Sequence, residues 1–164
     1  MAFNSTEVSA IPQRFTDVSN TAQNPVGSIV RGVDPTYGAA EFIYLPGVTA
    51  NVAGSVVYYD LGTPAVILAL ATANMGRPLA VSMSAATGAQ YGWYQISGVA
   101  VVQTNGTLTS AALPLYLAGA GQVTSTSAAG KQVVNAVSSS ATGVPAAGLA
   151  LATIQRPFAQ GAIT

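Results

Sequence analysis

Short apolar runs separated by turn residues fill the chain after residue 25. The runs are rich in Val, Ile, Tyr and Phe, and turn signals recur roughly every ten residues, as in small sandwiches and barrels. We expect strands over Gly27–Val33, Glu41–Leu45, Ser55–Tyr59, Ala65–Leu70, Pro78–Ser84, Tyr91–Ile96, Val99–Gln103, Leu108–Ala112, Pro114–Leu117, Gln132–Val137 and Leu149–Ile154. The pattern predicts an all-β fold, a small β-barrel or β-sandwich with long loops.

The dipeptide Asn105-Gly106 is the strongest local signal. Asn-Gly tolerates the two positive φ angles of a type I′ turn, so the runs on either side predict a β-hairpin. Helices have little support. Only Thr63–Met75 is rich enough in Ala and Leu to be helical in part.

The first 25 residues are polar and lack a clear period. We interpret residues 1–25 as an extended N-terminal arm and residues 26–164 as a single β-domain; a loose terminus is the alternative. An arm with spaced apolar residues can dock on a partner. The predicted contact residues of the arm are Phe3, Ile11, Arg14 and Phe15.

The composition removes most catalytic chemistry. The 164 residues include no Cys and no His, so disulfides, thiolate chemistry, a Ser-His-Asp triad and a His-based zinc site are excluded. No phosphate-binding Walker loop and no calcium-binding loop occurs. We therefore expect a protein that is not an enzyme and that holds no cofactor and no metal.

Charged residues make up only 6% of the chain, against about 25% in an ordinary soluble domain. Five scattered basic residues are a poor basis for binding nucleic acid or an anionic membrane surface. The longest apolar stretch, Ala65–Ala73, is far short of the ~20 residues of a membrane-spanning helix. The N-terminus lacks the basic and apolar regions of a secretory signal. These features predict synthesis in a cytoplasm, with no nucleic-acid or membrane partner.

Asp34, Glu41 and Asp60 are the candidates for acid-base work, and each falls at a predicted turn or strand edge, where a structural role is more common. All five acidic residues lie at or before Asp60, whereas three of the five basic residues follow it. This asymmetry is either chance or a sign of head-to-tail complementarity between neighbouring copies.

Tyr91, Trp93 and Tyr94 form the densest aromatic group. In a strand, Tyr91, Trp93 and Gln95 would lie on one side, and Tyr94 and Ile96 on the other. Such a group most often belongs to the core or to an interface between protomers, and a sugar-stacking platform is the alternative.

Three segments resemble small head proteins of tailed bacteriophages: DPTYGAAEFIYLPGV (Asp34–Val48), the following GSVVYYD, and AVSMSAATGAQYGWYQISGVAV (Ala80–Val101). The similarity returns in ATIQRPF (Ala152–Phe158), and QYGWYQISG (Gln90–Gly98) is its most specific part. The family carries no catalytic signature that could be transferred to this chain.

The resemblance implies a capsid decoration, or cement, protein. Such proteins are compact β-domains, often with an N-terminal arm, that sit outside the shell at local two-fold or three-fold positions and clamp adjacent subunits. The implied partners are the major capsid protein and further copies of the chain, as a trimer first and a dimer second. The implied location is the exterior of the virion. The alternative function is a carbohydrate-binding module or virion adhesin with an exposed aromatic face.

Overall fold

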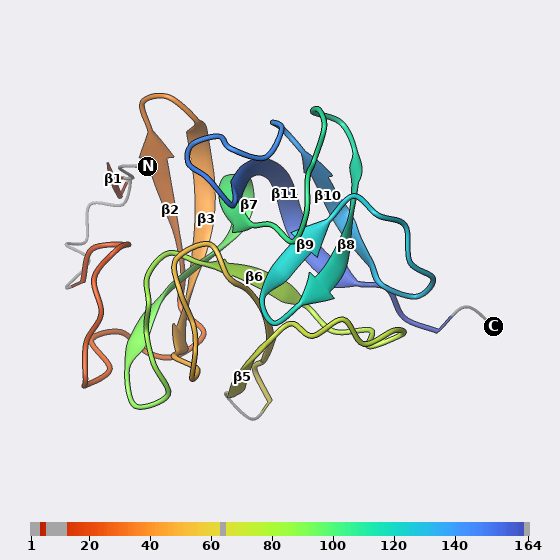
Figure 1. Ribbon diagram of the computed structural model, residues 1–164. Helices are drawn as coiled ribbons and strands as arrows, with labels where there is room; N and C mark the ends of the chain where they lie inside the picture. Colours follow the sequence, from red (N-terminus) through yellow and green to blue (C-terminus); the bar gives the residue numbers. More distant parts are fainter. Residues whose placement is uncertain (1–3, 6–12, 63–64, 163–164) are drawn as a thin grey trace.

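The computed structural model describes residues 4–5, 13–62 and 65–162, and within these ranges the chain is all-β, as the sequence predicts (Figure 1). The strands are β1 (Asn4–Ser5), β2 (Ile29–Asp34), β3 (Gly38–Pro46), β4 (Val56–Asp60), β5 (Ala65–Leu68), β6 (Leu79–Ser82), β7 (Tyr91–Gln103), β8 (Pro114–Gly119), β9 (Gln122–Thr124), β10 (Gln132–Ser138) and β11 (Leu149–Ala159).

The strands form one curled antiparallel sheet in the order β1-β2-β3-β7-β11-β10-β8-β9. β6 also pairs with β7, β4 pairs with β6, and β5 pairs with β4. The curl is plain in Figure 1, where β11 and β10 turn around the side opposite β2 and β3. β7 is therefore the strand on which the rest of the sheet is arranged.

β7 changes partners along its length of 13 residues. Its first half, Tyr91–Ile96, pairs with β3 and β6, and its second half, Ser97–Gln103, pairs with β11; Ser97, where the two halves meet, pairs with both β3 and β11. A register shift in the β3–β7 ladder and Gly98, at φ 92°, mark the change. A Cβ at Gly98 would lie 2.6 Å from the carbonyl oxygen of Ala39, so only glycine fits this close approach.

The core consists of three clusters, and β7 contributes to each. The largest lies inside the curl and includes Ala100 and Val102 of β7, with side chains from β4, β6, β8, β9, β10 and β11. The second includes Tyr94 and Ile96, which pack against β3, β4, β5 and β6. The third includes Trp93, which packs with residues of β3 and of the N-terminal segment. The predicted alternation of Trp93 against Tyr94 and Ile96 is confirmed.

The hairpin predicted at Asn105-Gly106 is wrong. The amide of Thr104 donates to the carbonyl of Gly148, and the amide of Asn105 donates to the carbonyl of Val123. The following stretch forms no strand, and Leu108 enters the largest cluster. Distant backbone partners and burial of Leu108 thus override the local turn preference.

The strand predicted at Ala65–Leu70 is confirmed as β5, and the alternative of a partial helix over Thr63–Met75 is wrong, because its described residues form β5 and then irregular structure. Two strands predicted separately, Tyr91–Ile96 and Val99–Gln103, are the single strand β7. β11 continues five residues beyond the predicted end at Ile154. In each case pairing with a neighbouring strand sets the bounds of the element: β5 pairs with β4, β7 with β3 and β11, and the end of β11 with β10.

Candidate functional site

Residues 13–25 lie on the β-domain. Phe15 is only 4% exposed; its ring stacks on that of Phe42 at a centroid distance of 4.0 Å and meets Trp93 edge-on at 5.7 Å. The ring of Phe15 is therefore part of the core and leaves no exposed surface for the predicted capsid contact. Arg14 is exposed, and Phe3 and Ile11 lie outside the described residues.

Hydrogen bonds hold this N-terminal segment in place. The hydroxyl of Tyr44 donates to Oε1 of Gln13 at 2.7 Å and accepts from the amide of Gln23 at 3.1 Å. The indole Nε1 of Trp93 donates to the carbonyl of Gln13 at 3.1 Å. Ser19 and Tyr91 exchange two backbone hydrogen bonds. The segment therefore acts as a cover over one face of the first half of β7.

The three predicted aromatic residues belong to the core. Trp93 and Tyr94 are fully buried, and Tyr91 is half-buried. The hydroxyl of Tyr94 donates to the carbonyl of Pro46 at 3.2 Å, and burial raises the pKa of this phenol well above its ordinary value. The alternative prediction, that these residues form a sugar-stacking platform, is wrong, because the side chains of Trp93 and Tyr94 are buried and present no surface to a ligand.

The second half of β7 has one face without a cover among the described residues. On this face Val99 pairs with Thr153, Val101 pairs with Leu151, and Thr153 pairs in turn with Val137. Val134 and Phe158 form a further exposed cross-strand pair where β10 meets β11. We call this surface the open face and define it by these residues: Val99, Val101, Val134, Val137, Leu151, Thr153 and Phe158. All are half-buried or exposed.

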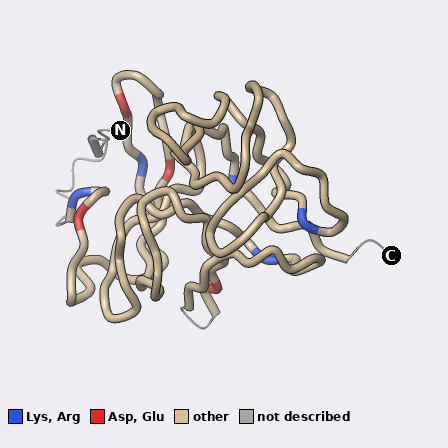
Figure 2. The backbone as a smooth tube through the Cα atoms, viewed as in Figure 1, with Lys and Arg blue, Asp and Glu red and all other residues tan. Residues whose placement is uncertain are grey.

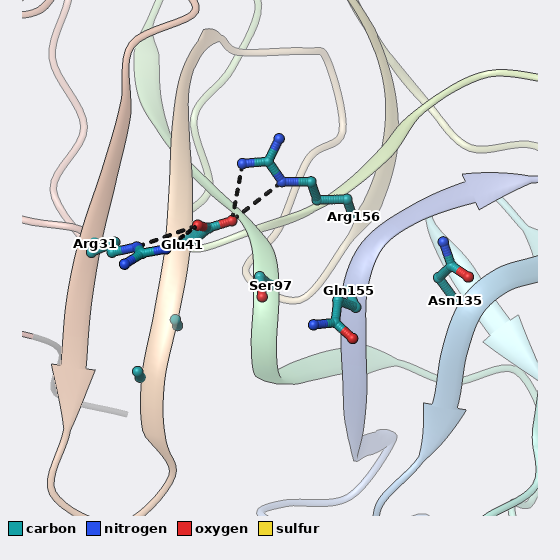
Figure 3. Close-up of a pocket in the computed structure, with 8 residues that line it drawn as sticks. Arg31, Glu41, Ser97, Asn135, Gln155 and Arg156 are labelled. Carbon is teal, nitrogen blue, oxygen red and sulfur yellow. Dashed lines mark hydrogen bonds and ion pairs between the residues drawn. The ribbon is translucent and has the colours of Figure 1, made fainter.

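A row of polar side chains borders the open face. Arg31 of β2 pairs with Glu41 of β3, Glu41 with Ser97 of β7, and Ser97 with Gln155 of β11. Cross-strand partners lie on the same face of a sheet. Together with Arg156 and Asn135 they line a shallow cavity of about 660 Å³, the polar groove, whose remaining wall is Ala39 and Ala40 (Figure 3).

Glu41 sits between the two arginines of the polar groove (Figure 3). Nη2 of Arg31 lies 3.3 Å from Oε1 of Glu41, and Nη2 of Arg156 lies 3.2 Å from Oε2. The carboxylate side chain is 19% exposed, whereas the arginine side chains are 72% and 61% exposed. Charged positions elsewhere are sparse (Figure 2), so three of the chain's ten charged residues meet in one place.

Two residues of the polar groove have a positive φ: Arg156 at 47° and Asn135, on the neighbouring strand, at 60°. A non-glycine residue in such a conformation costs about 1–3 kcal/mol, whereas an exposed ion pair contributes about 0–1 kcal/mol. The ion pair between Arg156 and Glu41 therefore does not by itself account for the strained position of Arg156.

The other candidate carboxylates serve turns. Oδ1 of Asp34 accepts from the amides of Thr36 and Tyr37 at 2.8 and 2.9 Å, and Oδ1 of Asp60 accepts from the amide of Gly62 at 2.8 Å. Their predicted structural role is confirmed.

Among residues 4–5, 13–62 and 65–162 there is no group of three or more acidic, His or Cys side chains that could hold a metal ion.

The polar groove was missed by sequence reasoning. The pairing of Arg31 with Glu41 had a signal, since the two residues lie in predicted strands on either side of the turn segment Asp34–Gly38. Arg156 is 115 residues from Glu41 and carried no such signal.

Comparisons of the chain with models of protein families, with curated proteins and with solved structures give no match. No helix among the described residues has the length and apolar character needed to cross a membrane.

Proposed function

We propose that this chain is a non-enzymatic structural protein of a tailed-phage virion, which decorates the outside of the capsid and stabilises it by bridging subunits of the major capsid protein. Self-association, as a trimer ahead of a dimer, is part of the proposal. Many symmetric copies act together, so each contact can be modest, and each bridge is effectively intramolecular once one side is bound.

The open face is the observation that carries this proposal. It is a three-stranded surface whose side chains include Val, Leu and Phe, and exposed apolar surface of this kind marks contact with another protein. The low charge of the chain fits a protein whose surface is largely occupied in an assembly. The resemblance to phage head proteins suggests that this assembly is a phage capsid.

The first test is co-sedimentation of the purified chain with undecorated phage heads. We expect saturable binding by the native chain. The double variant Val134→Ser/Val137→Ser, which makes the open face polar, should bind at least tenfold more weakly. A native chain that stays in the supernatant would overturn the proposal.

The matched control is Ile67→Ser/Leu70→Ser. These two apolar residues are as exposed as Val134 and Val137 but lie on and just after β5, away from the open face. We expect this control to bind like the native chain. Equal losses in the two double variants would show that the open face is not the contact surface.

A further inference from the structure

The polar groove offers hydrogen-bond donors that the fold does not use. Arg31 and Arg156 each direct Nε and Nη2 to Glu41, which occupies two of the five N–H groups of a guanidinium. Among the described residues, the side chains of Ser97, Asn135 and Gln155 make no hydrogen bond, although they line the same cavity. The groove thus presents a set of unused polar groups.

The charge of the groove favours an anion. Two guanidinium groups share one carboxylate, which leaves a net charge of +1 in the cavity. Glu41 holds the two arginines on its two oxygens, so both are oriented before a ligand arrives (Figure 3). Planar guanidinium groups with free N–H pairs are the preferred partners of carboxylates.

The surroundings of the polar groove favour a carboxylate carried by a protein partner over a free small molecule. Ser97 and Gln155 are cross-strand neighbours at the edge of the open face, so the polar groove and the apolar surface are continuous. The methyl groups of Ala39 and Ala40 leave the cavity shallow. A side chain that reaches the groove from a partner lying on the open face would need no deep pocket.

We propose that the polar groove binds a carboxylate side chain of the partner protein, with Arg31 and Arg156 as its charged contacts. This inference rests on the proposed function for the identity of the partner, which is then the capsid subunit. It makes the groove the part of the contact that fixes the orientation of the chain on the shell, while the open face supplies apolar area.

The first experiment does not need capsids. The ¹⁵N-labelled chain is titrated with N-acetyl-glutamate amide, which carries one side-chain carboxylate, while the arginine Nε–H signals are followed by NMR. We expect saturable shifts of the Arg31 and Arg156 signals and none with N-acetyl-glutamine amide. Equal shifts with both compounds, or no shifts, would overturn the inference; shifts with glucuronate alone would assign the groove to an acidic sugar instead.

The second experiment measures binding to undecorated heads. Arg156→Asn removes the guanidinium and keeps a residue type that tolerates positive φ; Arg31→Gln is the second variant if the first does not fold. We expect at least tenfold weaker binding for either variant. Arg77→Asn, an exposed arginine outside the groove, is the matched control and should stay within twofold of the native chain.

The outcomes separate the two proposals. If the native chain binds heads and the variants Arg156→Asn and Arg77→Asn bind them equally well, the carboxylate site in the polar groove is refuted and the proposed decoration function is retained. A native chain that fails to bind heads but shifts its arginine signals with the glutamate probe overturns the decoration function and leaves the carboxylate site standing.

Discussion

The two halves of β7 differ in how they are buried, although one strand carries both. Tyr91–Ile96 is enclosed on both faces, by the N-terminal segment on one side and by β4, β5 and β6 on the other. Ser97–Gln103 is enclosed on one face only, and its buried residues alternate with half-buried ones. The enclosed half contains Trp93 and two tyrosines, whereas the open half contains valines. Large aromatic side chains thus occur where remote segments cover them, and small β-branched ones where the surface stays open.

The largest loss of stability should come from Trp93→Ala, which removes the largest side chain from the enclosed half of β7. Loss of a fully buried tryptophan costs about 3–5 kcal/mol, because the cavity left between Phe15, Phe42 and Tyr44 cannot close without moving β3. Urea denaturation measures the loss. Val101→Ala, in the open half, is the control and should cost about 1 kcal/mol or less. Similar costs for the two variants would contradict the contrast between the halves.

A smaller effect is expected from Tyr44→Phe, which separates hydrogen bonding from packing. The ring remains, but Oε1 of Gln13 and the amide of Gln23 lose their bonds to the hydroxyl. The expected cost is about 1–2 kcal/mol, with faster amide hydrogen exchange confined to residues 13–23. Amide exchange rates that stay at native values would mean that the packing of Phe15, without the hydrogen bonds of Tyr44, is enough to keep the N-terminal segment in place.

The smallest effect on stability is expected from Val134→Ser/Val137→Ser in the open face. Both side chains are at least 40% exposed, so little buried area is lost, and the free energy of unfolding should change by about 0.5 kcal/mol or less. Thermal unfolding of the isolated chain checks this. A large decrease would show that these valines support the fold and would remove the open face as a candidate contact.

The strand content of the fold was predictable from the sequence, because alternation and turn residues are local properties. Nearly every predicted run lies in a strand, and Trp93 faces away from Tyr94 as its spacing indicates. The register of the sheet was not predictable. Local preference favoured a hairpin at Asn105-Gly106, but Thr104 and Asn105 pair with Gly148 and Val123, which no local pattern announces.

The candidate site was predictable only in part, for the same reason. The position of Phe15 among polar residues suggested an arm, yet its ring completes a cluster with Phe42 and Trp93. Arg31 and Glu41 are close in sequence and pair across a turn, whereas Arg156 reaches them only because β11 joins β7 at Ser97. Contacts between remote strands depend on the order and register of the whole sheet, which a single sequence does not specify residue by residue.

The sharing of β7 among all three clusters links partner binding to folding. A ligand that recognises only the native chain raises its free energy of unfolding in proportion to the logarithm of its concentration over the dissociation constant, by about 2.7 kcal/mol at a hundredfold excess. Because the strand that borders the open face also anchors Trp93 and Tyr94, this gain would extend to the aromatic clusters on its other half. Docking on the open face would therefore also protect the aromatic clusters on the first half of β7 against heat and proteolysis.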